Sequence, residues 1–546
     1  MIEAGCQVNP DHAYVIAMHQ PGDTLPTLVR SKGRAGKQRL EWSYAEMRLA
    51  SCRLASQLLK DGVEPGSTLA TFISNRAEWT ILYWTAALLR LTFVPLDHRA
   101  LTAARKHELK TYMETLRPSV VVVNDADETE VLDSVCKETA LDVRVKTTLR
   151  NAKKSWRLLD TIAADMRASD MIDGHAQTGD DDPERTAIIL FTSGTSTGKP
   201  KGVPMSVQNI CAGQATYVLS RHIDHTQRFI LHTANFRAAA ASYTMACAST
   251  AGTLIMPGDG FSTVGVLDAI EKEYATNIWV VPAQVFAIIE DPEFRTRDLS
   301  ALRVLCISGD MVTKSVLEKS KQAFGSANVI SGHGMTEGIG NLGWLDAEQD
   351  IPAFGEIVAV GTVLPGTRLK LVEDGHLCKM GDIGELHMGG PKMITGYLDK
   401  EQQELFYTDD AGHWVITGDR ARLDQNGNVF ILGRSKDIIK RKGIPIPPAA
   451  IESCLNRHSG MTQCFGIPDP ILGENPIAVV RSTDGSDERT LKKVVVDTMG
   501  PDFALGHVLT LEKLGFSDWP VNETGKVIKT KLKDAAIGFL AKRNGS

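Results

Sequence analysis

A strand-like apolar run at 187–191 leads directly into a loop rich in glycine and hydroxyl side chains. The segment LFTSGTSTGKPKGV, from Leu190 to Val203, places Lys199 and Lys201 after the small residues. Glycines let the backbone approach an anion, hydroxyl and amide groups donate hydrogen bonds to its oxygens, and lysines add positive charge. An ordinary polar turn would not need two lysines and a preceding apolar strand. We therefore predict a phosphate-binding loop.

The spacing of this loop differs from that of a Walker loop. Only three residues separate Gly194 from the pair Gly198 and Lys199. Pro200 stands where a Walker loop carries the Ser or Thr that binds magnesium. The loop therefore indicates phosphate binding of another kind.

A second glycine-rich segment, SGHGMTEGIG at 331–340, contains the carboxylate of Glu337. Carboxylate oxygen is a suitable ligand for the hard cation Mg2+. The overlapping sequence GIGNLG at 338–343 matches the GxGxxG pattern of dinucleotide-binding folds. We reject that interpretation because no strand ends at Gly338 and Pro352 interrupts the stretch where the helix would begin.

Three later residues could complete a nucleotide site. Asp419 follows a glycine and could accept hydrogen bonds from two sugar hydroxyls, and Arg434 follows Gly433 after an apolar run. Lys526 lies in a TGK triplet and could reach a developing negative charge. Each residue taken singly is better explained by a surface role, as a turn carboxylate, a surface cation or a tail lysine. Their order along the chain is what favours a common site.

Length and composition limit the possible classes of protein. With 546 residues, 43% hydrophobic and 23% charged, the chain has a globular composition and the length of roughly two to four domains. A net charge of -6 gives no general attraction to nucleic acid or to anionic membrane. The apolar stretch 80–96 is interrupted by Arg90 and closed by Pro95, so it predicts a buried helix and strand rather than a membrane span.

The nine cysteines are dispersed and include no CxxC pair, which indicates free thiols rather than a disulfide framework or a zinc site. We therefore expect a cytoplasmic protein with no nucleic-acid partner and no transmembrane segment.

Strands and helices alternate up to about residue 430. The predicted strands are 70–73, 119–123, 187–191, 278–281 and 303–308. Alternation on this scale predicts an α/β fold with parallel strands. From about 355 the pattern changes to short strands with turn glycines, and the last hundred or so residues indicate a small α+β unit.

The motifs follow one another in a fixed order over nearly the whole chain. Between the phosphate loop and the TGK triplet they are VVP (280–282), SGD (308–310), GHGMTE (332–337), VGTVLPG (360–366), GELHMGGPKMITGY (384–397), TGD (417–419) and GRSKDIIKRKG (433–443). In these motifs the chain resembles the adenylate-forming superfamily, which contains acyl-CoA synthetases, 4-coumarate-CoA ligase, firefly luciferase and the adenylation domains of peptide synthetases. The resemblance implies an N-terminal AMP-binding domain, 1–434, with a β-rich subdomain from about 355, and a small mobile C-terminal domain, 435–546.

The family implies ATP-dependent activation of a carboxylic acid to an acyl-adenylate, followed by transfer to the thiol of CoA. Catalysis then depends on positioning and on charge neutralisation at the α-phosphate. By resemblance, Lys526 bridges the carboxylate and the α-phosphate, Thr336 contacts the α-phosphate and Glu337 binds Mg2+. Asp419 and Arg434 bind the ribose hydroxyls. The other nucleotide-binding residues that the family implies are Thr192, Ser193, Gly194, Thr195, Ser196, Thr197, Gly198, Lys199 and Lys201 at the β- and γ-phosphates, Gly309, Asp310 and His333 around the adenine, and Gly334 and Met335 elsewhere at the nucleotide.

Lys436 falls at the hinge of the family, two residues after Arg434. Rotation of the C-terminal domain about this hinge would withdraw Lys526 and bring the segment with Lys440, Lys442 and Gly443 toward the site for attack by the thiol. An exposed linker lysine and a solvated helix face explain these residues equally well.

Three departures from the family pattern affect the assignments. The phosphate loop has one residue more than the commoner TSGTTG, so the hydroxyl roles could shift by one position. His333 replaces the usual aromatic residue against adenine. Arg237 stands where the family often has His near the carboxylate channel, and either a surface salt bridge or a direct carboxylate or phosphate contact would explain it. Phe236, Arg237 and Ala241 are the predicted acyl-side residues, and the alanine run favours an aliphatic or bulky acyl group.

The sequence thus predicts an acyl-CoA ligase of fatty-acid or secondary-metabolite biosynthesis that uses ATP, Mg2+ and CoA. The first alternative is an acyl-AMP ligase that loads a carboxylic acid onto the phosphopantetheine of a carrier protein in polyketide or non-ribosomal peptide biosynthesis. A catalytically silent nucleotide-binding paralogue is disfavoured because Glu337, Asp419, Arg434 and Lys526 are all present. An amino-acid-adenylating enzyme is disfavoured because HTANFRAAAAS at 232–242 offers no acid to hold an ammonium group.

Overall fold

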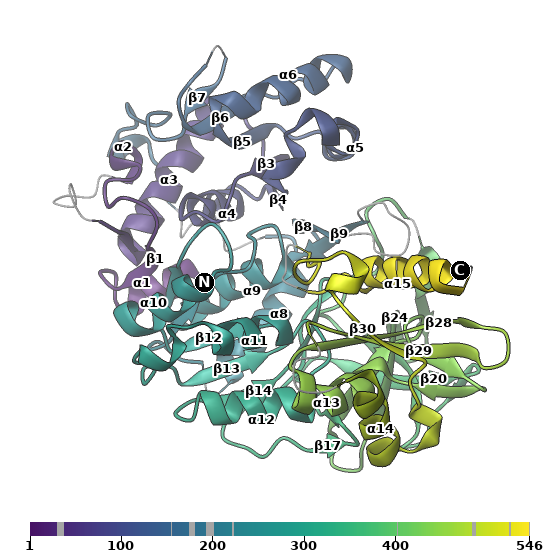
Figure 1. Cartoon of the computed structure of the whole chain (residues 1–546). Helices are drawn as coiled ribbons and strands as arrows, with labels where there is room; N and C mark the ends of the chain where they lie inside the picture. Colours follow the sequence, from purple (N-terminus) through teal and green to yellow (C-terminus); the bar gives the residue numbers. More distant parts are fainter. Residues whose placement is uncertain are drawn as a thin grey trace. The chain divides into compact units, whose positions relative to one another are not determined.

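The computed structural model describes residues 1–29, 38–153, 155–173, 181–192, 201–220, 223–400, 402–482, 487–522 and 526–544 (Figure 1). These residues form two compact units. The first unit comprises 1–277, 335–340 and 391–406, and the second unit comprises 278–334, 341–390 and 407–546. Both units combine helices with sheets, and the sheets include parallel strands, which confirms the predicted α/β class.

One sheet of the first unit carries the strand that leads into the predicted phosphate loop. Its order is β7-β6-β5-β3-β4-β8-β9, in which β3 to β8 are parallel and only β9 is antiparallel. The four consecutive valines of β5 are buried, as expected for a parallel strand covered on both faces. The strands are β3 (Thr68–Phe72), β4 (Thr92–Pro95), β5 (Val120–Asp125), β6 (Val145–Arg150), β7 (Arg157–Leu158), β8 (Thr186–Thr192) and β9 (Lys201–Ser206).

Helices α5 (Lys106–Leu116) and α6 (Thr129–Glu138) cover one face of this sheet. Leu109 and Met113 of α5 and Leu132 of α6 belong to one apolar cluster with Val121 and Val123 of β5. Burial of each such aliphatic side chain stabilises the fold by about 1.5–3 kcal/mol.

A second group of strands in the first unit has the order β10-β11-β1-β2, with β10, β11 and β1 parallel and β2 antiparallel. Two helices of the first unit, α3 and α8, begin with capping boxes, formed by Ser43 with Glu46 and by Ser206 with Asn209. The remaining elements of this unit are α1 (Ile2–Val8), β1 (Ala13–Ala17), α2 (Pro26–Val29), β2 (Leu40–Ser43), α3 (Tyr44–Lys60), α4 (Glu78–Leu88), α8 (Val207–Leu219), β10 (Arg228–Ile230), α9 (Ala238–Thr250), β11 (Thr253–Met256) and α10 (Thr263–Glu273).

The second unit begins with alternating strands and helices and continues as a β-rich region. Strands β13 and β14 are parallel, whereas the pairs β20–β21, β20–β22, β22–β24 and β24–β25 are antiparallel. This confirms the change of pattern predicted from about residue 355. The elements are β12 (Asn277–Val280), α11 (Pro282–Glu290), β13 (Val304–Ile307), α12 (Lys314–Ala323), β14 (Asn328–Ser331), β15 (His333–Met335), β16 (Gly338–Gly343), β17 (Ala353–Phe354), β18 (Ile357–Val358), β19 (Thr362–Val363), β20 (Arg368–Glu373), β21 (His376–Leu377), β22 (Ile383–Gly389), β23 (Phe406–Asp409), β24 (Gly412–Leu423) and β25 (Val429–Arg434).

The C-terminal part of the second unit is the predicted small α+β structure. Strands in the order β27-β26-β29-β28 form its sheet, and β30 pairs with β29. The elements are β26 (Ile439–Arg441), β27 (Ile444–Ile446), α13 (Pro448–Ser459), β28 (Thr462–Asp469), β29 (Gly473–Val480), α14 (Glu488–Met499), β30 (His507–Thr510) and α15 (Lys529–Asn544). The domain boundary after residue 434 stays a prediction.

The predicted strands 70–73, 119–123, 187–191, 278–281 and 303–308 correspond to β3, β5, β8, β12 and β13. The apolar stretch 80–96 forms most of α4 and then β4. The sequence GIGNLG forms β16 itself, so the rejection of a dinucleotide loop holds, but the glycine-rich segment predicted as a loop consists largely of short strands. Among the described residues, no helix combines the length and the apolar character needed to cross a membrane.

Candidate active site

Asp419 and Arg434 face each other in the second unit, because β24 and β25 pair them directly in register. Arg434 Nε lies 3.0 Å from Asp419 Oδ1, and His333 Nε2 donates to Asp419 Oδ2 across 3.3 Å. Asp419 is only 5% exposed. Burial acts to raise the pKa of its carboxyl, but the hydrogen bond from His333 and the charges of Arg434 and Lys526 outweigh burial and lower it. An ionised carboxylate of this kind can accept hydrogen bonds from two sugar hydroxyls.

The backbone before Asp419 fixes this pair. Thr417 Oγ1 accepts a hydrogen bond from the Asp419 amide at 3.1 Å, and Arg434 Nη1 donates to the Thr417 carbonyl at 2.6 Å. The guanidinium is therefore held at two points, although half of the Arg434 side chain stays exposed. The ring nitrogen Nδ1 of His333 is buried and has no hydrogen-bond partner among the described residues. A ligand that binds here would meet one oriented cation and one ring nitrogen that is not yet satisfied.

Asp310 and Lys526, far apart in the sequence, form an ion pair in the second unit. Lys526 Nζ lies 3.3 Å from Asp310 Oδ1, and the two side chains are 42% and 27% exposed. Asp310 Oδ1 also accepts a hydrogen bond from the Met311 amide at 2.9 Å. The preceding Gly309 has a φ of +81°, and an added Cβ would lie 3.1 Å from Val281, so the turn that presents Asp310 requires glycine. The structure thus brings the predicted catalytic lysine to a residue predicted at the adenine.

Glu337 and Lys201 share a contact with Tyr397 in the first unit. Tyr397 donates its hydroxyl to Glu337 Oε1 at 2.8 Å, and Lys201 Nζ lies 5.2 Å from the centroid of the Tyr397 ring. Lys201 is only 7% exposed, and its ammonium also donates to Oε1 of Gln402. The predicted metal ligand and one predicted phosphate lysine therefore lie around one tyrosine. Sequence reasoning missed Tyr397 and Gln402, although Tyr397 ends the motif GELHMGGPKMITGY.

A bridge between Gly338 and Met393 ties the segment that carries Glu337 to the chain before Tyr397, and Ile394 N donates to the Glu337 carbonyl at 3.0 Å. Thr336, the predicted α-phosphate contact, lies half-buried between β15 and β16, and Gly334 and Met335 complete β15.

Lys392 lies fully buried beneath this segment. Its ammonium donates to the Gly340 carbonyl at 2.6 Å, and burial lowers the pKa of Lys392 to about 8. Nothing in the sequence singled out this lysine, because its position in the motif gives no sign that it is buried.

The two ends of the predicted phosphate loop are described, but most of the loop is not. Thr192 ends β8 and Lys201 begins β9, and the two residues pair across these antiparallel strands. The predictions for Ser193, Gly194, Thr195, Ser196, Thr197, Gly198 and Lys199 lie outside the described residues.

Phe236, Arg237 and Ala241, the predicted acyl-side residues, lie at the beginning of α9 in the first unit. Arg237 precedes the helix, and its guanidinium lies 5.1 Å from the centroid of the Phe236 ring. Phe236 and Ala241 are buried, whereas Arg237 is half-buried. One buried side-chain amide positions this turn: Asn75 Nδ2 donates to the Thr233 carbonyl at 2.8 Å, and Asn75 Oδ1 accepts a hydrogen bond from the Asn235 backbone amide at 2.8 Å.

The predicted hinge and thiol-side residues have their own contacts within the second unit. Lys436 and Lys440 are exposed, and Lys442 and Gly443 have positive φ values of 51° and 78°. The Lys442 amide donates to the Leu472 carbonyl at 2.7 Å, and the Lys440 amide donates to Glu474 Oε2 at 2.7 Å. Within the described ranges, no contact joins these residues to Asp310, Asp419 or Lys526.

The predicted metal ligand can be compared with what Mg2+ requires. Among these residues, no group of three or more His, Cys, Asp or Glu side chains could hold a metal ion. Mg2+ is commonly held by one or two carboxylates together with substrate phosphates and water. Glu337, which offers one carboxylate, fits that requirement.

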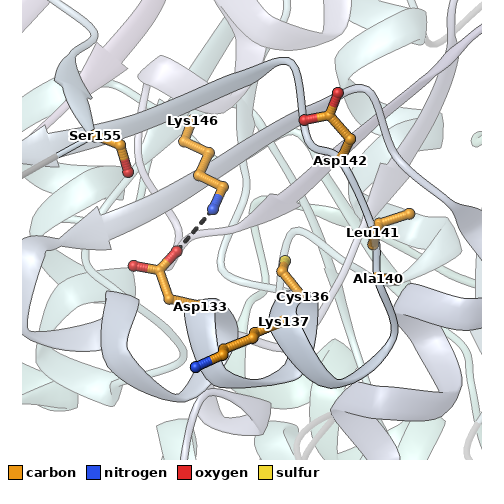
Figure 2. A pocket seen from close by; sticks show the side chains of 8 residues that line it. All are labelled: Asp133, Cys136, Lys137, Ala140, Leu141, Asp142, Lys146 and Ser155. Carbon is orange, nitrogen blue, oxygen red and sulfur yellow. Dashed lines mark hydrogen bonds and ion pairs between the residues drawn. The ribbon is translucent and has the colours of Figure 1, made fainter.

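A surface hollow of about 510 Å3 lies on α6 and β6 of the first unit, away from all predicted site residues in sequence (Figure 2). Asp133 and Lys146 face each other across it with an Nζ–Oδ1 distance of 2.8 Å, so their charges are mutually compensated. Because these charges compensate each other and no predicted site residue lines the hollow, we do not assign the catalytic site to it.

Comparisons with known proteins identify the family and the fold. A family model described as AMP-binding enzyme matches residues 10–398. The chain is 32% identical over 557 aligned positions to an acyl-CoA ligase of Pestalotiopsis microspora, covering 99% of this chain and 96% of that protein. ATP-bound MatB from Rhodopseudomonas palustris matches with a TM-score of 0.77 and 21% identity over 98% of both chains. An anthranilate CoA ligase in complex with anthranoyl-AMP matches with a TM-score of 0.81 and 18% identity over 99% of this chain and 97% of that one.

Proposed function

The chain belongs to the AMP-binding enzyme family, and from this premise we propose that it joins a carboxylic acid to the thiol of CoA through an acyl-adenylate. The observation that carries the proposal is the set of His333, Asp419 and Arg434 in one unit with the ion pair of Asp310 and Lys526. A relative named as an acyl-CoA ligase, similar over nearly the full length of both chains, supports the choice of acceptor.

The chemistry explains why the site needs these groups. A carboxylate is a poor electrophile because its leaving group would be oxide, whereas AMP leaves readily. One carboxylate oxygen therefore attacks the α-phosphate in line, forms a C–O–P linkage and expels pyrophosphate. The substrate carboxylate and the α-phosphate are both anions and repel each other as they approach. Cations positioned between them therefore supply most of the catalysis.

Each residue then has a stated task in the first step. Asp419 accepts hydrogen bonds from the ribose hydroxyls, and Arg434 orients the Asp419 carboxylate. Lys526 leaves Asp310 and places its ammonium between the substrate carboxylate and the α-phosphate. Lys201 and the phosphate loop neutralise the outgoing pyrophosphate, and Glu337 would hold the Mg2+ that shields the phosphate oxygens when bound.

The second step requires a different arrangement of the same chain. The thiolate attacks the acyl carbonyl, the C–O bond to AMP breaks, and AMP leaves with both bonding electrons. We propose that the division at residues 434 and 435 and the hinge at Lys436 serve this exchange, as the resemblance to the family implies for the segment from Lys440 to Gly443. Arg237, half-buried beside Phe236, is the proposed contact to the acid on the acyl side.

The proposed setting is fatty-acid or secondary-metabolite biosynthesis in the cytoplasm. The location rests on the nine cysteines, all of which are free thiols in the structure. The setting rests on the resemblance to acyl-CoA synthetases.

ATP–pyrophosphate exchange with a panel of carboxylic acids tests the first step, and thioester formation with CoA or with a holo-carrier protein tests the second. We expect exchange that depends on one class of acid, and thioester formation with free CoA. Absence of exchange with every acid, from folded protein, would contradict the proposed activity. Thioester formation only with the carrier protein would show that the acceptor is the phosphopantetheine of a carrier protein rather than free CoA.

A further inference from the structure

Lys526 lies at one end of a turn whose described ends, Val521 and Val527, form a bridge, and α15 begins at Lys529. The Asn522 amide donates to the Lys526 carbonyl at 2.9 Å, the Lys526 amide donates to Asn522 Oδ1 at 3.1 Å, and Val521 and Val527 form a bridge. The Ile528 amide donates to the Pro520 carbonyl at 2.7 Å. These bonds fix the backbone of Lys526 relative to its own turn. They do not fix the turn relative to the rest of the unit.

The direct contact of Lys526 with the rest of the unit is a weak one. Its ion pair with Asp310 spans 3.3 Å and is substantially exposed. Exposed pairs of this kind hold a long side chain only loosely. This ion pair must also break when Lys526 moves to its substrates. The pair with Asp310 therefore cannot hold the turn in place during the reaction.

A second, more deeply buried ion pair involves Lys529, three residues further along the chain. Lys529, the first residue of α15, places its Nζ 2.5 Å from Oε1 of Glu452 on α13. The same Oε1 accepts a hydrogen bond from the Cys464 amide of β28 at 2.7 Å. The Glu452 and Lys529 side chains are 11% and 26% exposed, against 27% and 42% for Asp310 and Lys526. Glu452 thus joins α13, β28 and the beginning of α15 at one atom.

A shared cavity links Glu452 of this buried pair to Lys526. Asp310, Glu452 and Lys526 line one cavity of about 30 Å3, together with Val527. Only Val527 and Ile528 separate Lys526 from Lys529, which limits the distance between their Cα atoms to about 10 Å. A shift at the beginning of α15 would therefore be passed directly to Lys526.

We propose that Glu452 and Lys529 are positioning residues for Lys526. Their ion pair holds the beginning of α15 and the turn before it, so that Lys526 can exchange Asp310 for the substrate carboxylate and the α-phosphate without loss of alignment. The inference rests on the proposed function and adds to it two residues to which the sequence analysis assigned no role.

The apolar contacts of α15 separate this role from a general contribution to folding. Leu532, Ala536 and Leu540 of α15 are buried in one cluster with Phe465 and Val479. This cluster holds the body of the helix without the ion pair. Loss of the ion pair should therefore affect the beginning of α15, next to Lys526, rather than the body of the helix.

The variant Lys529→Met tests the proposal, with Lys529→Arg as the conservative rescue and Lys531→Met as the matched control on the exposed face of α15. Two rates are measured for each: ATP–pyrophosphate exchange, and thioester formation from chemically supplied acyl-adenylate and CoA. We expect kcat for exchange in Lys529→Met to fall about 100-fold, because misplacement of a catalytic group by about 1 Å costs this much. The KM for ATP and the transfer from acyl-adenylate should stay within about twofold of wild type, because neither depends on Lys526.

Lys529→Arg should keep exchange within about threefold of wild type, since a guanidinium can also pair with Glu452. Lys531→Met should behave as wild type. Should Lys529→Met fail to fold, as judged by circular dichroism, Glu452→Gln is measured in its place with the same expectation.

Equal loss of exchange and transfer, or unchanged exchange in a folded Lys529→Met, would overturn the positioning role. The same assay separates this failure from failure of the proposed function. A wild-type protein with no exchange for any acid contradicts the proposed function, whereas an active wild type with an equally active Lys529→Met contradicts only the inference.

Discussion

Two clusters of charged residues in the two units are organised differently. In the second unit, His333, Asp419 and Arg434 contact one another, so the carboxylate is compensated before any ligand binds. In the first unit, the Glu337 carboxylate accepts a hydrogen bond from the neutral hydroxyl of Tyr397, and the Lys201 ammonium contacts an amide and a ring. No ion pair involves Glu337 or Lys201 among the described residues.

The difference indicates what each cluster does. A carboxylate with its partners in place is preorganised, and binding a ribose costs little rearrangement. For the half-buried carboxylate of Glu337 and the buried ammonium of Lys201, we expect the compensating charges to come from the proposed nucleotide and its Mg2+. We therefore expect variants in the second unit to change ATP binding and chemistry, and variants around Glu337 to change the response to Mg2+.

Lys526→Ala should have the largest effect. Loss of a cation at the α-phosphate should lower ATP–pyrophosphate exchange about 100- to 1000-fold. Transfer from supplied acyl-adenylate to CoA should stay within about twofold, because the charge that Lys526 neutralises no longer forms in that step. Lys531→Ala is the matched control. Equal loss of both half-reactions would contradict the assigned role.

Asp419→Asn should have the next largest effect. The change keeps the volume but removes the charge that faces His333 and Arg434. A charge-assisted hydrogen bond is worth about 1.5–3 kcal/mol, so the KM for ATP should rise about 10- to 150-fold. Asp410→Asn, at an exposed position of the same unit, is the control.

Deoxy-ATP analogues separate a ribose contact from a general disturbance at Asp419. The wild type should lose affinity when a ribose hydroxyl is removed, and Asp419→Asn should lose little more. Additive losses would show that Asp419 does not bind the ribose.

Glu337→Gln should act mainly through Mg2+. Removing the carboxylate should raise the Mg2+ concentration for half-maximal exchange about tenfold, while exchange at saturating Mg2+ falls less. Tyr397→Phe removes only the hydrogen bond to Glu337 and should shift the same midpoint by less than about fivefold. A midpoint that does not move in Glu337→Gln would remove Glu337 from the metal site.

Lys392→Met should have the smallest effect on activity. Its main effect should be on the pH dependence of the free energy of unfolding. Below about pH 8 the wild type carries the full cost of a buried ammonium in the folded state. Between pH 8 and the ordinary lysine pKa, the folded state releases this proton while the unfolded state keeps it. The free energy of unfolding of the wild type should therefore rise relative to Lys392→Met, by at most about 1.4 kcal/mol per pH unit. Urea denaturation at several pH values measures it, and a pH-independent difference would place the ammonium in a less buried environment.

Much of the fold could be predicted from the sequence, because apolar runs and motifs are local signals, whereas the nucleotide-binding roles of the motif residues stay predictions. Asp419 and Arg434 were predicted as partners at one sugar, and the register of β24 and β25 places them side by side. The motif GHGMTE led to His333, which contacts the same carboxylate.

The contacts that depend on tertiary structure could not be predicted. The ion pair of Asp310 with Lys526 joins distant parts of the sequence, and no residue type marks it in advance. Glu452 and Lys529 lie on two helices as ordinary charged residues, and only their burial shows that they are a pair. The roles of Ser193 to Lys199 stay predictions, because these residues lie outside the described part of the chain.

Transfer of an oxygen isotope tests the central claim most directly. A carboxylic acid labelled with oxygen-18 is converted to its CoA thioester, and the released AMP and pyrophosphate are examined by mass spectrometry. Attack of the carboxylate on the α-phosphate predicts one labelled oxygen in AMP and none in pyrophosphate. Unlabelled AMP, or label in inorganic phosphate, would contradict activation through an acyl-adenylate.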